Sequence, residues 1–387
     1  MEKPNISYKA LIPVLFSFFV MSFCDLVGIG VDNARNDFNV SNTLAQLIPM
    51  AVFVWFFALS LPVGLLQQRI GKRNMVNIGM LVTAAGLLLP FLYYTFPTLL
   101  LGFVLLGIGN TILQVSANPL LIEVVPAHRS ASFLSFSQFV KALGSMIAPF
   151  VASYFALQTG NWKIVFLVFG AISLLSAVWL HLTPVAEMQT GAERATFRSA
   201  FQLLSIPYIL LMVLGIFFVV GIDVGINSTS GQFLMEKLGM DPEPAKQGRS
   251  LYFFGKMLGT FAGAMLLTRF NPGKFLMTSA VLTLVLIVSL IFAPSAALAL
   301  SLMFAIGLAA ANIFPLIFAG TVARYTGRNN EISGLMIMAV SGGAFVPPLA
   351  GWFTDVSGVS GGMMVLAACA AFLVFLAFYE LSQKNTR

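Results

Sequence analysis

The chain has 387 residues, of which 58% are hydrophobic and only 9% are charged, too few to cover a water-facing surface. Soluble domains carry about 25% charged residues, so a soluble protein is excluded and a polytopic, all-α membrane protein is expected. The net charge of +7 then indicates cytoplasmic loops rich in Lys and Arg, rather than binding to nucleic acid.

Apolar segments of the length that a bilayer requires, about 20 residues each, predict twelve transmembrane helices. In the first half of the chain we expect helices at residues 10–31, 44–68, 74–95, 98–125, 131–157 and 162–182. In the second half we expect them at residues 207–235, 250–268, 275–293, 295–322, 332–354 and 361–381. The polar stretch between the sixth and seventh helices divides the chain into residues 1–182, a cytoplasmic linker at 183–206, and residues 207–387.

The distribution of Lys and Arg predicts the orientation in the membrane. If the N-terminus is cytoplasmic, fourteen of these residues fall on the cytoplasmic side and two, Lys141 and Lys256, fall within helices. The opposite side then holds only five, which are Arg35, Lys163, Lys237, Lys246 and Arg249. Because cytoplasmic loops carry the excess of positive residues, we expect both termini in the cytoplasm.

The two halves of the sequence match at a nearly constant offset. A shift of 199 residues relates Phe18 to Phe217, Arg129 to Arg328, Gly144 to Gly343 and Pro149 to Pro348. With six helices in each half, equivalent helices keep the same orientation, which makes this a parallel repeat. Transporters built from such repeats bind their substrates at the repeat interface, near the middle of the membrane.

Two aspartates lie inside apolar segments. Asp25 occurs in FFVMSFCDLVGIGVDN (18–33), and Asp223 occurs 198 residues later in FFVVGIDVGINS (217–228). A charge at the centre of a membrane helix costs about 2.5–3.5 kcal/mol on insertion scales, and Lys141 adds a third. We therefore interpret Asp25 and Asp223 as cation-coupling residues. The alternative is a structural ion pair that joins the two halves.

The same two carboxylates indicate which ion is coupled to transport. A carboxylate in a low-dielectric setting can gain and lose a proton near neutral pH, which favours a proton. Sodium is the alternative, because backbone carbonyls of a helix broken at residues 28–30 can join Asp25 as ligands. No other cofactor and no resident metal site is indicated.

Polar side chains recur at helical spacing on several predicted helices. They are Asn110, Gln114 and Asn118 on helix 4, Gln138 and Lys141 on helix 5, Asn227 on helix 7, Tyr252 and Lys256 on helix 8, and Asn312 on helix 10. Spacings of three and four place such residues on one helix face. Amides donate and accept hydrogen bonds as sugar hydroxyls do, so we predict that these residues bind a neutral sugar. Hydrogen bonding between helices is the alternative.

The loop GLLQQRIGKR (64–73) resembles the major facilitator signature G-x-L-x-D-R-x-G-R-R through Gly64, Arg69, Gly71, Lys72 and Arg73. Gln68 stands where an Asp is usual, which puts the usual charge latch at this loop in doubt. The stretches ILQVSANPL (112–120) and GGAFVPPLAG (342–351) further resemble the fucose permease branch of that superfamily. One departure is Gln114, which replaces a glutamate of fucose permease in helix 4.

This resemblance implies a major facilitator fold of two pseudo-symmetric six-helix halves. It also implies a secondary active transporter that imports fucose, glucose, galactose or a related sugar together with a cation, by alternating access. We accordingly expect a multi-pass, monomeric protein of the bacterial inner membrane whose partners are a small sugar, a coupling cation and the lipid bilayer.

Three other functions fit the sequence less well. An intramembrane aspartyl protease resembles a Tyr-Asp plus Gly-x-Gly-Asp pattern, whereas the contexts here are CD and GID, so we expect no enzyme. Exporters of the same fold resemble proteins with an arginine in helix 4 and a Gly-Pro motif in helix 5, where this chain has GSMIAP. An importer of organic anions needs arginines in the cavity, and no arginine falls within a predicted helix.

Overall fold

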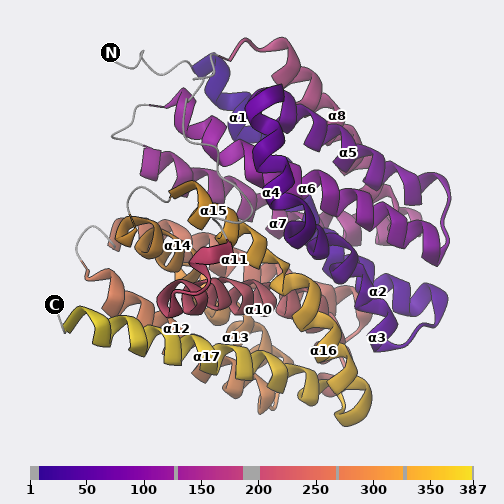
Figure 1. The fold of residues 1–387 in the computed structure, drawn as a ribbon. Coiled ribbons are helices and arrows are strands. Elements are labelled where there is room, and N and C mark those ends of the chain that lie inside the picture. Colours follow the sequence, from indigo (N-terminus) through magenta and orange to yellow (C-terminus); the bar gives the residue numbers. More distant parts are fainter. Residues whose placement is uncertain (1–7, 126–129, 186–200, 267–269, 326–328, 386–387) are drawn as a thin grey trace.

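The computed structural model describes residues 8–125, 130–185, 201–266, 270–325 and 329–385 of the chain (Figure 1). The first half comprises α1 (Tyr8–Met21), the 3-10 turn η1 (Ser22–Leu26), α2 (Val27–Phe38), α3 (Asn42–Ala45), α4 (Leu47–Ile70), α5 (Lys72–Leu92), α6 (Phe96–Val124), α7 (Ser130–Thr159) and α8 (Ile164–Leu182). The second half comprises α10 (Pro207–Leu238), α11 (Pro242–Leu266), α12 (Pro272–Ile291), α13 (Ala296–Ala310), α14 (Ile313–Arg324), α15 (Asn329–Met338), the turn η3 (Ala339–Ser341), α16 (Gly342–Ser357) and α17 (Val359–Asn385).

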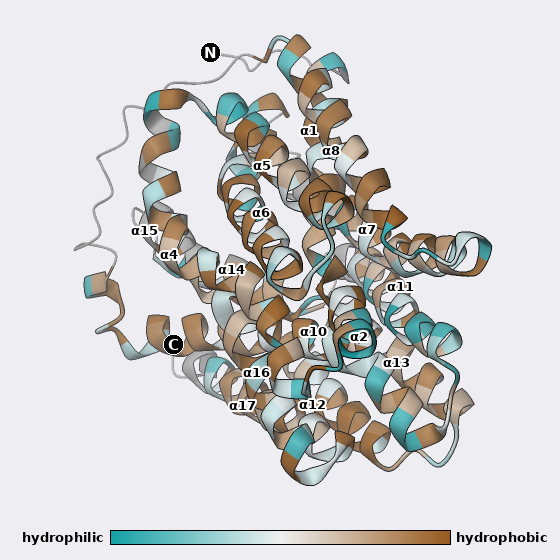
Figure 2. Cartoon of the chain, turned by 90° about the vertical axis from the view of Figure 1, so that its right-hand side faces the viewer, coloured by the Kyte–Doolittle hydropathy of each residue, from teal (hydrophilic) through white to brown (hydrophobic). Residues whose placement is uncertain are grey.

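The helices form two bundles, one from each half of the chain, that lie side by side (Figure 1). The described N-terminal and C-terminal ends are at the same end of the molecule, on the left in Figure 1, which we call the terminal side. The opposite end is the far side. Hydrophobic residues run along most helices, and hydrophilic residues gather at several helix ends and around α2 and α11 (Figure 2).

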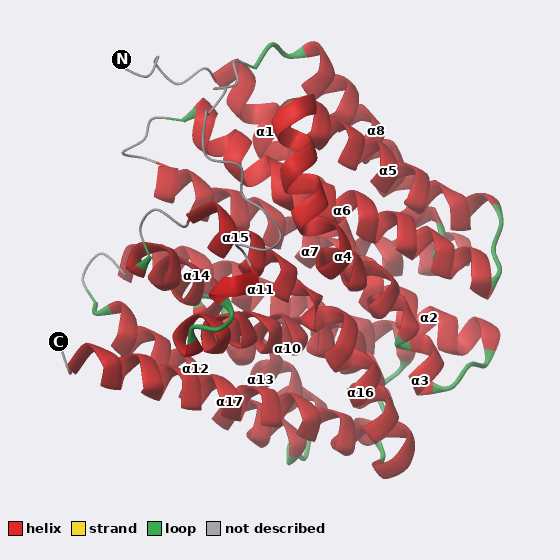
Figure 3. Cartoon of the chain, viewed as in Figure 1, coloured by secondary structure: helices red, strands yellow, loops and turns green. Residues whose placement is uncertain are grey.

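The described helices group into twelve spans (Figure 3). Three spans are interrupted: span 1 is α1, η1 and α2, span 10 is α13 and α14, and span 11 is α15, η3 and α16. In the described residues, eleven spans are long and apolar enough to cross a bilayer. Span 8, which is α11, is not among them and carries Lys246, Arg249 and Lys256. The prediction of twelve helices in two halves is confirmed.

Two spans extend further toward the far side than the hydropathy pattern predicts. Span 1 ends at Phe38 rather than at residue 31, and span 8 begins at Pro242 rather than at residue 250. Both extensions are polar helical segments, and Asp32, Asn33, Lys246 and Arg249 within them are buried where the two halves meet, as described below. The predicted linker at residues 183–206 falls largely outside the described residues and stays a prediction.

The packing of the spans repeats between the halves. In the first half α4 packs on α6, α5 on α8 and α1 on α7. The equivalent contacts in the second half are α11 on α13, α12 on α17 and α10 on α16. Between the halves α7 packs on α11, α4 on α16 and α2 on α10. The pseudo-symmetry therefore extends to tertiary contacts, and spans 1, 2, 5, 7, 8 and 11 form the interface.

Glycines hold span 8 against span 10. A Cβ atom at Gly307 would lie 2.0 Å from the carbonyl oxygen of Tyr252, and one at Gly255 would lie 2.0 Å from that of Phe304. Only glycine permits this close backbone approach, which is typical of helix packing in membranes. The contact fixes the position of α11, and with it the side chains of Tyr252 and Lys256.

Candidate functional site

Asp25 lies in the 3-10 turn that interrupts span 1. The turn η1 spans Ser22–Leu26, so the irregular backbone is at Asp25 itself, and residues 28–30 are α-helical. The expected break at residues 28–30 is therefore wrong. The hydroxyl of Ser145 on α7 donates to the Asp25 carboxylate at 2.5 Å. In the described residues no cation is within ion-pair distance of Asp25, although Lys141 and Lys256 attract it from further away.

Two buried amides hold this turn from opposite halves. The Asn110 side chain on α6 donates to the Met21 carbonyl at 2.7 Å, and the Asn227 side chain on α10 donates to the Asp25 carbonyl at 2.8 Å. Both residues are fully buried. Because a 3-10 turn leaves carbonyls without regular helical partners, these amides stabilise the interruption. Asn110 and Asn227 thus lie close to Asp25, but their side-chain N–H groups donate to backbone carbonyls.

Asp223 has a different environment from Asp25, although the two lie on equivalent spans. Its carboxylate accepts a hydrogen bond from the fully buried Tyr252 hydroxyl and forms an ion pair of 2.5 Å with Lys256. Lys256 keeps 26% and Asp223 16% of the side-chain surface exposed. All three residues belong to the second half, from α10 and α11. The ion pair neutralises Asp223 within one half and does not lock the two halves together.

The polar side chains of Gln114 and Asn118 on α6, and of Gln138 and Lys141 on α7, are partly exposed. Gln114 donates to the Asn110 side chain at 2.8 Å, and Asn118 donates to the Gln114 carbonyl at 3.0 Å. The side chains of Gln138 and Lys141 are half-buried and make no hydrogen bond to any described residue. These last two have donors and an acceptor available for a ligand.

Asn312 makes no hydrogen bond to the polar residues of α6 and α7 described above. It is buried at the junction of α13 and α14, and its side chain donates to the Gly259 carbonyl at 2.7 Å. This hydrogen bond joins span 10 to span 8. The arrangement matches the bonding between helices that the sequence left open as an alternative, and a role of Asn312 in binding stays a prediction.

The far side holds a group of charges that sequence reasoning misplaced or missed. Arg249 was expected in an outer loop, but its side chain is fully buried in α11 and paired with Asp32 of α2. Nearby, Lys246 contacts Asn33 at 3.4 Å, and Arg35 pairs with Glu236 at 2.9 Å. Asp32 went unnoticed because hydropathy ended span 1 at residue 31.

The buried position of Arg249 bears on whether the protein could transport an organic anion. An arginine does lie inside a span, contrary to the sequence expectation, but Asp32 neutralises it. Asp32 Oδ1 and the Arg249 Nε and Nη1 atoms are buried without hydrogen-bond partners in the described structure. A Cβ at Gly231 would lie 2.5 Å from Asp32 Oδ2, and one at Gly28 would lie 2.9 Å from Arg249 Nη1. Both side chains of the pair are thus shielded from solvent, at 0% and 1% exposed, with Gly28 and Gly231 packed closely against them.

Other polar contacts join the halves at the far side. Asp355 of α16 accepts hydrogen bonds from the Asn42 side chain at 2.6 Å and from the Thr43 backbone at 3.0 Å. Gln247 of α11 donates to Ser153 of α7 at 3.2 Å. Together with the charge pairs, these contacts connect spans 1, 2 and 5 to spans 7, 8 and 11 beyond the level of Asp25.

The far end of span 1 is also anchored within its own half. Asp37 accepts hydrogen bonds from the Tyr94 hydroxyl at 2.7 Å and from the Trp162 ring at 3.1 Å. Burial and the bond to Asp37 raise the pKa of Tyr94, so its hydroxyl remains a donor. These bonds attach the far end of span 1 to the first half.

The signature loop on the terminal side organises the first half. Gly71 adopts φ 92° between α4 and α5, a conformation that favours glycine. Lys72 pairs with Glu123 at the end of α6, while Arg73 donates to the carbonyls of Leu180 and His181 at the end of α8. Lys72 and Arg73 thus both contact helix ends of their own half.

Two equivalent helical halves with buried charges at their interface are typical of secondary transporters. The family model described as the Major Facilitator Superfamily matches residues 11–248 and 212–387 of this chain. The chain therefore belongs to the Major Facilitator Superfamily, and it is a membrane transporter rather than an enzyme.

Curated relatives and solved structures cover nearly the whole chain. A glucose/galactose transporter of Brucella abortus is 28% identical over an alignment 385 residues long, which covers 95% of this chain and 92% of the relative. The L-fucose-proton symporter of Escherichia coli is 23% identical and covers 90% of this chain and 87% of its own length. A crystal structure of the E. coli fucose:proton symporter superposes with a TM-score of 0.71 at 21% identity, over 95% and 97% of the chains. The predicted resemblance to the fucose permease branch is confirmed.

Proposed function

We propose that this protein imports a neutral hexose or deoxyhexose, such as glucose, galactose or fucose, in symport with a proton. The names of its relatives support this class, since they include a glucose/galactose transporter and an L-fucose-proton symporter. Import proceeds by alternating access, in which the two halves rock about the residues at their interface.

The observation that carries the proposal is the contrast between Asp25 and Asp223. Asp223 has an ion pair with Lys256 and a hydrogen bond from Tyr252. Asp25 has only the Ser145 hydroxyl as a close side-chain donor from the other spans, and it lies at the interface between the halves. Asp25 is therefore the carboxylate whose charge can change during transport without breaking a contact ion pair.

The coupling ion is a proton rather than sodium. A sodium site in the turn would draw on backbone carbonyls, and those of Met21 and Asp25 each accept a hydrogen bond from Asn110 or Asn227, which takes one of their two lone pairs and makes them weaker sodium ligands. Protonation of Asp25 needs no further ligand.

The sugar binds beside this carboxylate, to the partly exposed amides of α6 and α7. Gln138 and Lys141 lie one turn apart and have no hydrogen bonds to described side chains or backbone. Gln114 and Asn118 present the neighbouring face of α6. A cluster with one charge and several amides suits a neutral polyol, whose hydroxyls donate as well as accept.

Counterflow in proteoliposomes tests the proposal. Purified protein is loaded with unlabelled hexose and challenged with a panel of radiolabelled sugars, and uphill uptake is then driven by a proton gradient or by a sodium gradient alone. We expect exchange of at least one neutral hexose, and accumulation with the proton gradient in sodium-free buffer. Absence of exchange across the panel would refute the substrate class, and accumulation with sodium alone would refute the coupling ion.

Gln138→Ala is expected to weaken sugar binding about tenfold, because one direct hydrogen bond contributes roughly 1–1.5 kcal/mol. Isothermal titration or half-maximal counterflow measures the change. The matched control is Gln232→Ala, which removes the same side chain from α10, where it bonds to Glu236 near the far side. Equal affinities of the wild type and Gln138→Ala would place the sugar elsewhere.

We also propose that the terminal side is cytoplasmic and that the structure is the state closed toward the outside. The excess of Lys and Arg on the terminal side supports this orientation. The far-side contacts of Asp32 with Arg249 and of Arg35 with Glu236 support the closed state. Residues 183–206 then form a cytoplasmic linker in the inner membrane protein.

An epitope tag inserted at residue 240 tests this orientation. The position lies between α10, which ends at Leu238, and α11, which begins at Pro242. We expect the tag to bind antibody on intact spheroplasts, while a tag at the C-terminus becomes accessible only after permeabilisation. The opposite pattern would invert the proposed topology.

A further inference from the structure

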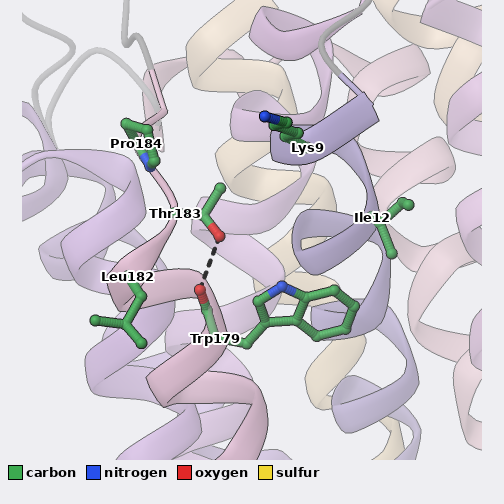
Figure 4. Close-up of a pocket in the computed structure, with 6 residues that line it drawn as sticks. All are labelled: Lys9, Ile12, Trp179, Leu182, Thr183 and Pro184. Atoms are coloured by element: carbon green, nitrogen blue, oxygen red, sulfur yellow. Dashed lines mark hydrogen bonds between the residues drawn. The ribbon is translucent and has the colours of Figure 1, made fainter.

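A groove runs along the outer face of the first half, between α1 and α8. Its upper part, at the terminal side, is an open hollow of about 400 Å³ lined by Lys9, Ile12, Trp179, Leu182, Thr183 and Pro184 (Figure 4). A second hollow of about 220 Å³ is lined by Phe16, Ile172, Leu175, Ser176 and again Trp179. The indole of Trp179 therefore links the two hollows into one groove.

The depth of the groove in the membrane follows from the ends of the two helices. Span 1 becomes apolar from Lys9 onward, and span 6 ends at Leu182. The upper hollow is therefore at the boundary between membrane and water. Leu175 lies seven residues before Leu182 on α8, which is about 10 Å deeper at 1.5 Å per residue. The groove thus extends from headgroup depth into the hydrocarbon region.

The walls of the groove are apolar along their length. Trp179 is 44% exposed, Leu175 70% and Leu182 75%. The two hydroxyls in the groove bond to their own helix, since Ser176 donates to the Ile172 carbonyl at 2.6 Å and Thr183 donates to the Trp179 carbonyl at 2.8 Å. Both hydroxyl protons are therefore engaged, and the lining below Lys9 is otherwise apolar except for the Trp179 indole, so an acyl chain suits these walls.

The mouth of the groove is positively charged. Lys9 is exposed, and in the described residues it has no acidic partner and no hydrogen bond from its side chain. The adjacent end of α8 has its carbonyls covered by the Arg73 guanidinium, so the negative end of the helix dipole is offset there. Lys9 extends toward the hollow opposite Thr183 and Pro184 (Figure 4).

We propose that this groove is a binding site for an anionic phospholipid of the leaflet on the terminal side. The lipid phosphate contacts Lys9, and one acyl chain lies along Trp179 toward Phe16 and Leu175. A basic residue beside membrane helices attracts anionic headgroups, and tryptophan is favoured at this depth. The site is distinct from the polar residues around Asp25 and does not depend on which solute the protein transports.

Photo-crosslinking on the full-length protein in nanodiscs tests the proposal. The probe is phosphatidylglycerol with a photoreactive acyl chain, compared with phosphatidylcholine that carries the same chain, and crosslinked peptides are mapped by mass spectrometry. We expect crosslinks in residues 12–19 and 172–179, stronger for phosphatidylglycerol. Lys9→Gln should lower the phosphatidylglycerol signal about fivefold, as expected for loss of one basic contact at the surface, and should leave the phosphatidylcholine signal unchanged.

The matched control is Lys274→Gln, which removes an exposed lysine near the start of α12 in the other half and should have no effect. Trp179→Ala should reduce crosslinking of both lipids, because it removes the wall shared by the two hollows. Equal crosslinking of the two lipids in the wild type, or an unchanged signal in Lys9→Gln, would overturn the assignment of the headgroup. Absence of crosslinks from α1 and α8 would overturn the site.

Discussion

Asp25→Asn is expected to abolish proton-driven sugar accumulation while leaving sugar counterflow measurable. The neutral asparagine imitates the protonated aspartate in charge but cannot release a proton. An ionised Asp25 without a contact cation is costly when the interface closes around it, and protonation removes this cost. Because a ligand shifts a conformational equilibrium only through its different affinities for the two states, this difference can couple rocking of the halves to the proton gradient.

The measurement is uptake of radiolabelled hexose against its gradient, compared with exchange at equal sugar concentrations on both sides. We expect accumulation to fall to the level without a gradient, and exchange to remain within about tenfold of the wild type, since one hydrogen bond to Ser145 is altered. Full gradient-driven uptake in Asp25→Asn would show that this carboxylate is structural.

Asp223→Asn provides the comparison and should fail differently. It leaves Lys256 without its ion-pair partner, so we expect lower expression or weaker sugar binding rather than clean uncoupling. The double variant Asp223→Asn with Lys256→Met removes both charges and should recover folding, because replacing an intact pair is far less costly than breaking it. Uncoupled exchange in Asp223→Asn with full coupling in Asp25→Asn would reverse the assigned roles.

Arg249→Met is expected to open the far side of the transporter. The substitution leaves Asp32, which is 1% exposed, without a cation, and breaking a buried pair in this way costs about 3–5 kcal/mol. When the far side opens, water reaches the Asp32 carboxylate. Loss of the ion pair therefore shifts the population toward the state that is open at the far side. We expect sugar transport to fall by at least about tenfold, as a shift of this size changes the equilibrium by more than one decade.

Thiol labelling measures this opening. Ser230 is fully buried on α10, next to the Gly231 that contacts Asp32, and Ser230→Cys supplies a reporter of similar size once the native Cys24 and Cys369 are replaced by Ala. Labelling should accelerate about tenfold or more in Arg249→Met. In the double variant Asp32→Leu with Arg249→Met both charges are gone, so labelling should return toward the wild-type rate. An unchanged rate in Arg249→Met would mean that the pair does not hold the far side closed.

The positions of the spans were largely predictable because hydropathy reports directly on the cost of placing residues in lipid. The repeat of 199 residues predicted the pseudo-symmetry, which tertiary contacts such as α4 on α6 and α11 on α13 reproduce. The prediction failed at the far-side turns of α2 and α11. There Asp32 and Arg249 neutralise each other across the interface. Hydropathy is averaged over neighbouring residues of the chain, so it does not report a partner 217 residues away.

The polar residues within the spans were identified correctly as unusual, but their partners were not predictable. Helical spacing put Asn110, Gln114 and Asn118 on one face, yet Asn110 bonds to a backbone carbonyl of another span. Likewise, Asp25 and Asp223 lie on equivalent helices of the repeat, whereas only Asp223 forms an ion pair with a lysine. Pairing depends on which helices become neighbours, and a periodic pattern specifies only a direction around one helix.

By itself the sequence determined that this is a twelve-span membrane protein in two related halves, because length, apolarity and repetition are properties of the chain alone. Only the tertiary structure decided that span 1 breaks at Asp25, that Lys256 neutralises Asp223, and that Asp32 and Arg249 meet between the halves. The physical reason is that hydrophobic burial is additive along the chain, whereas the energy of a buried charge or carbonyl is set by the single partner that reaches it.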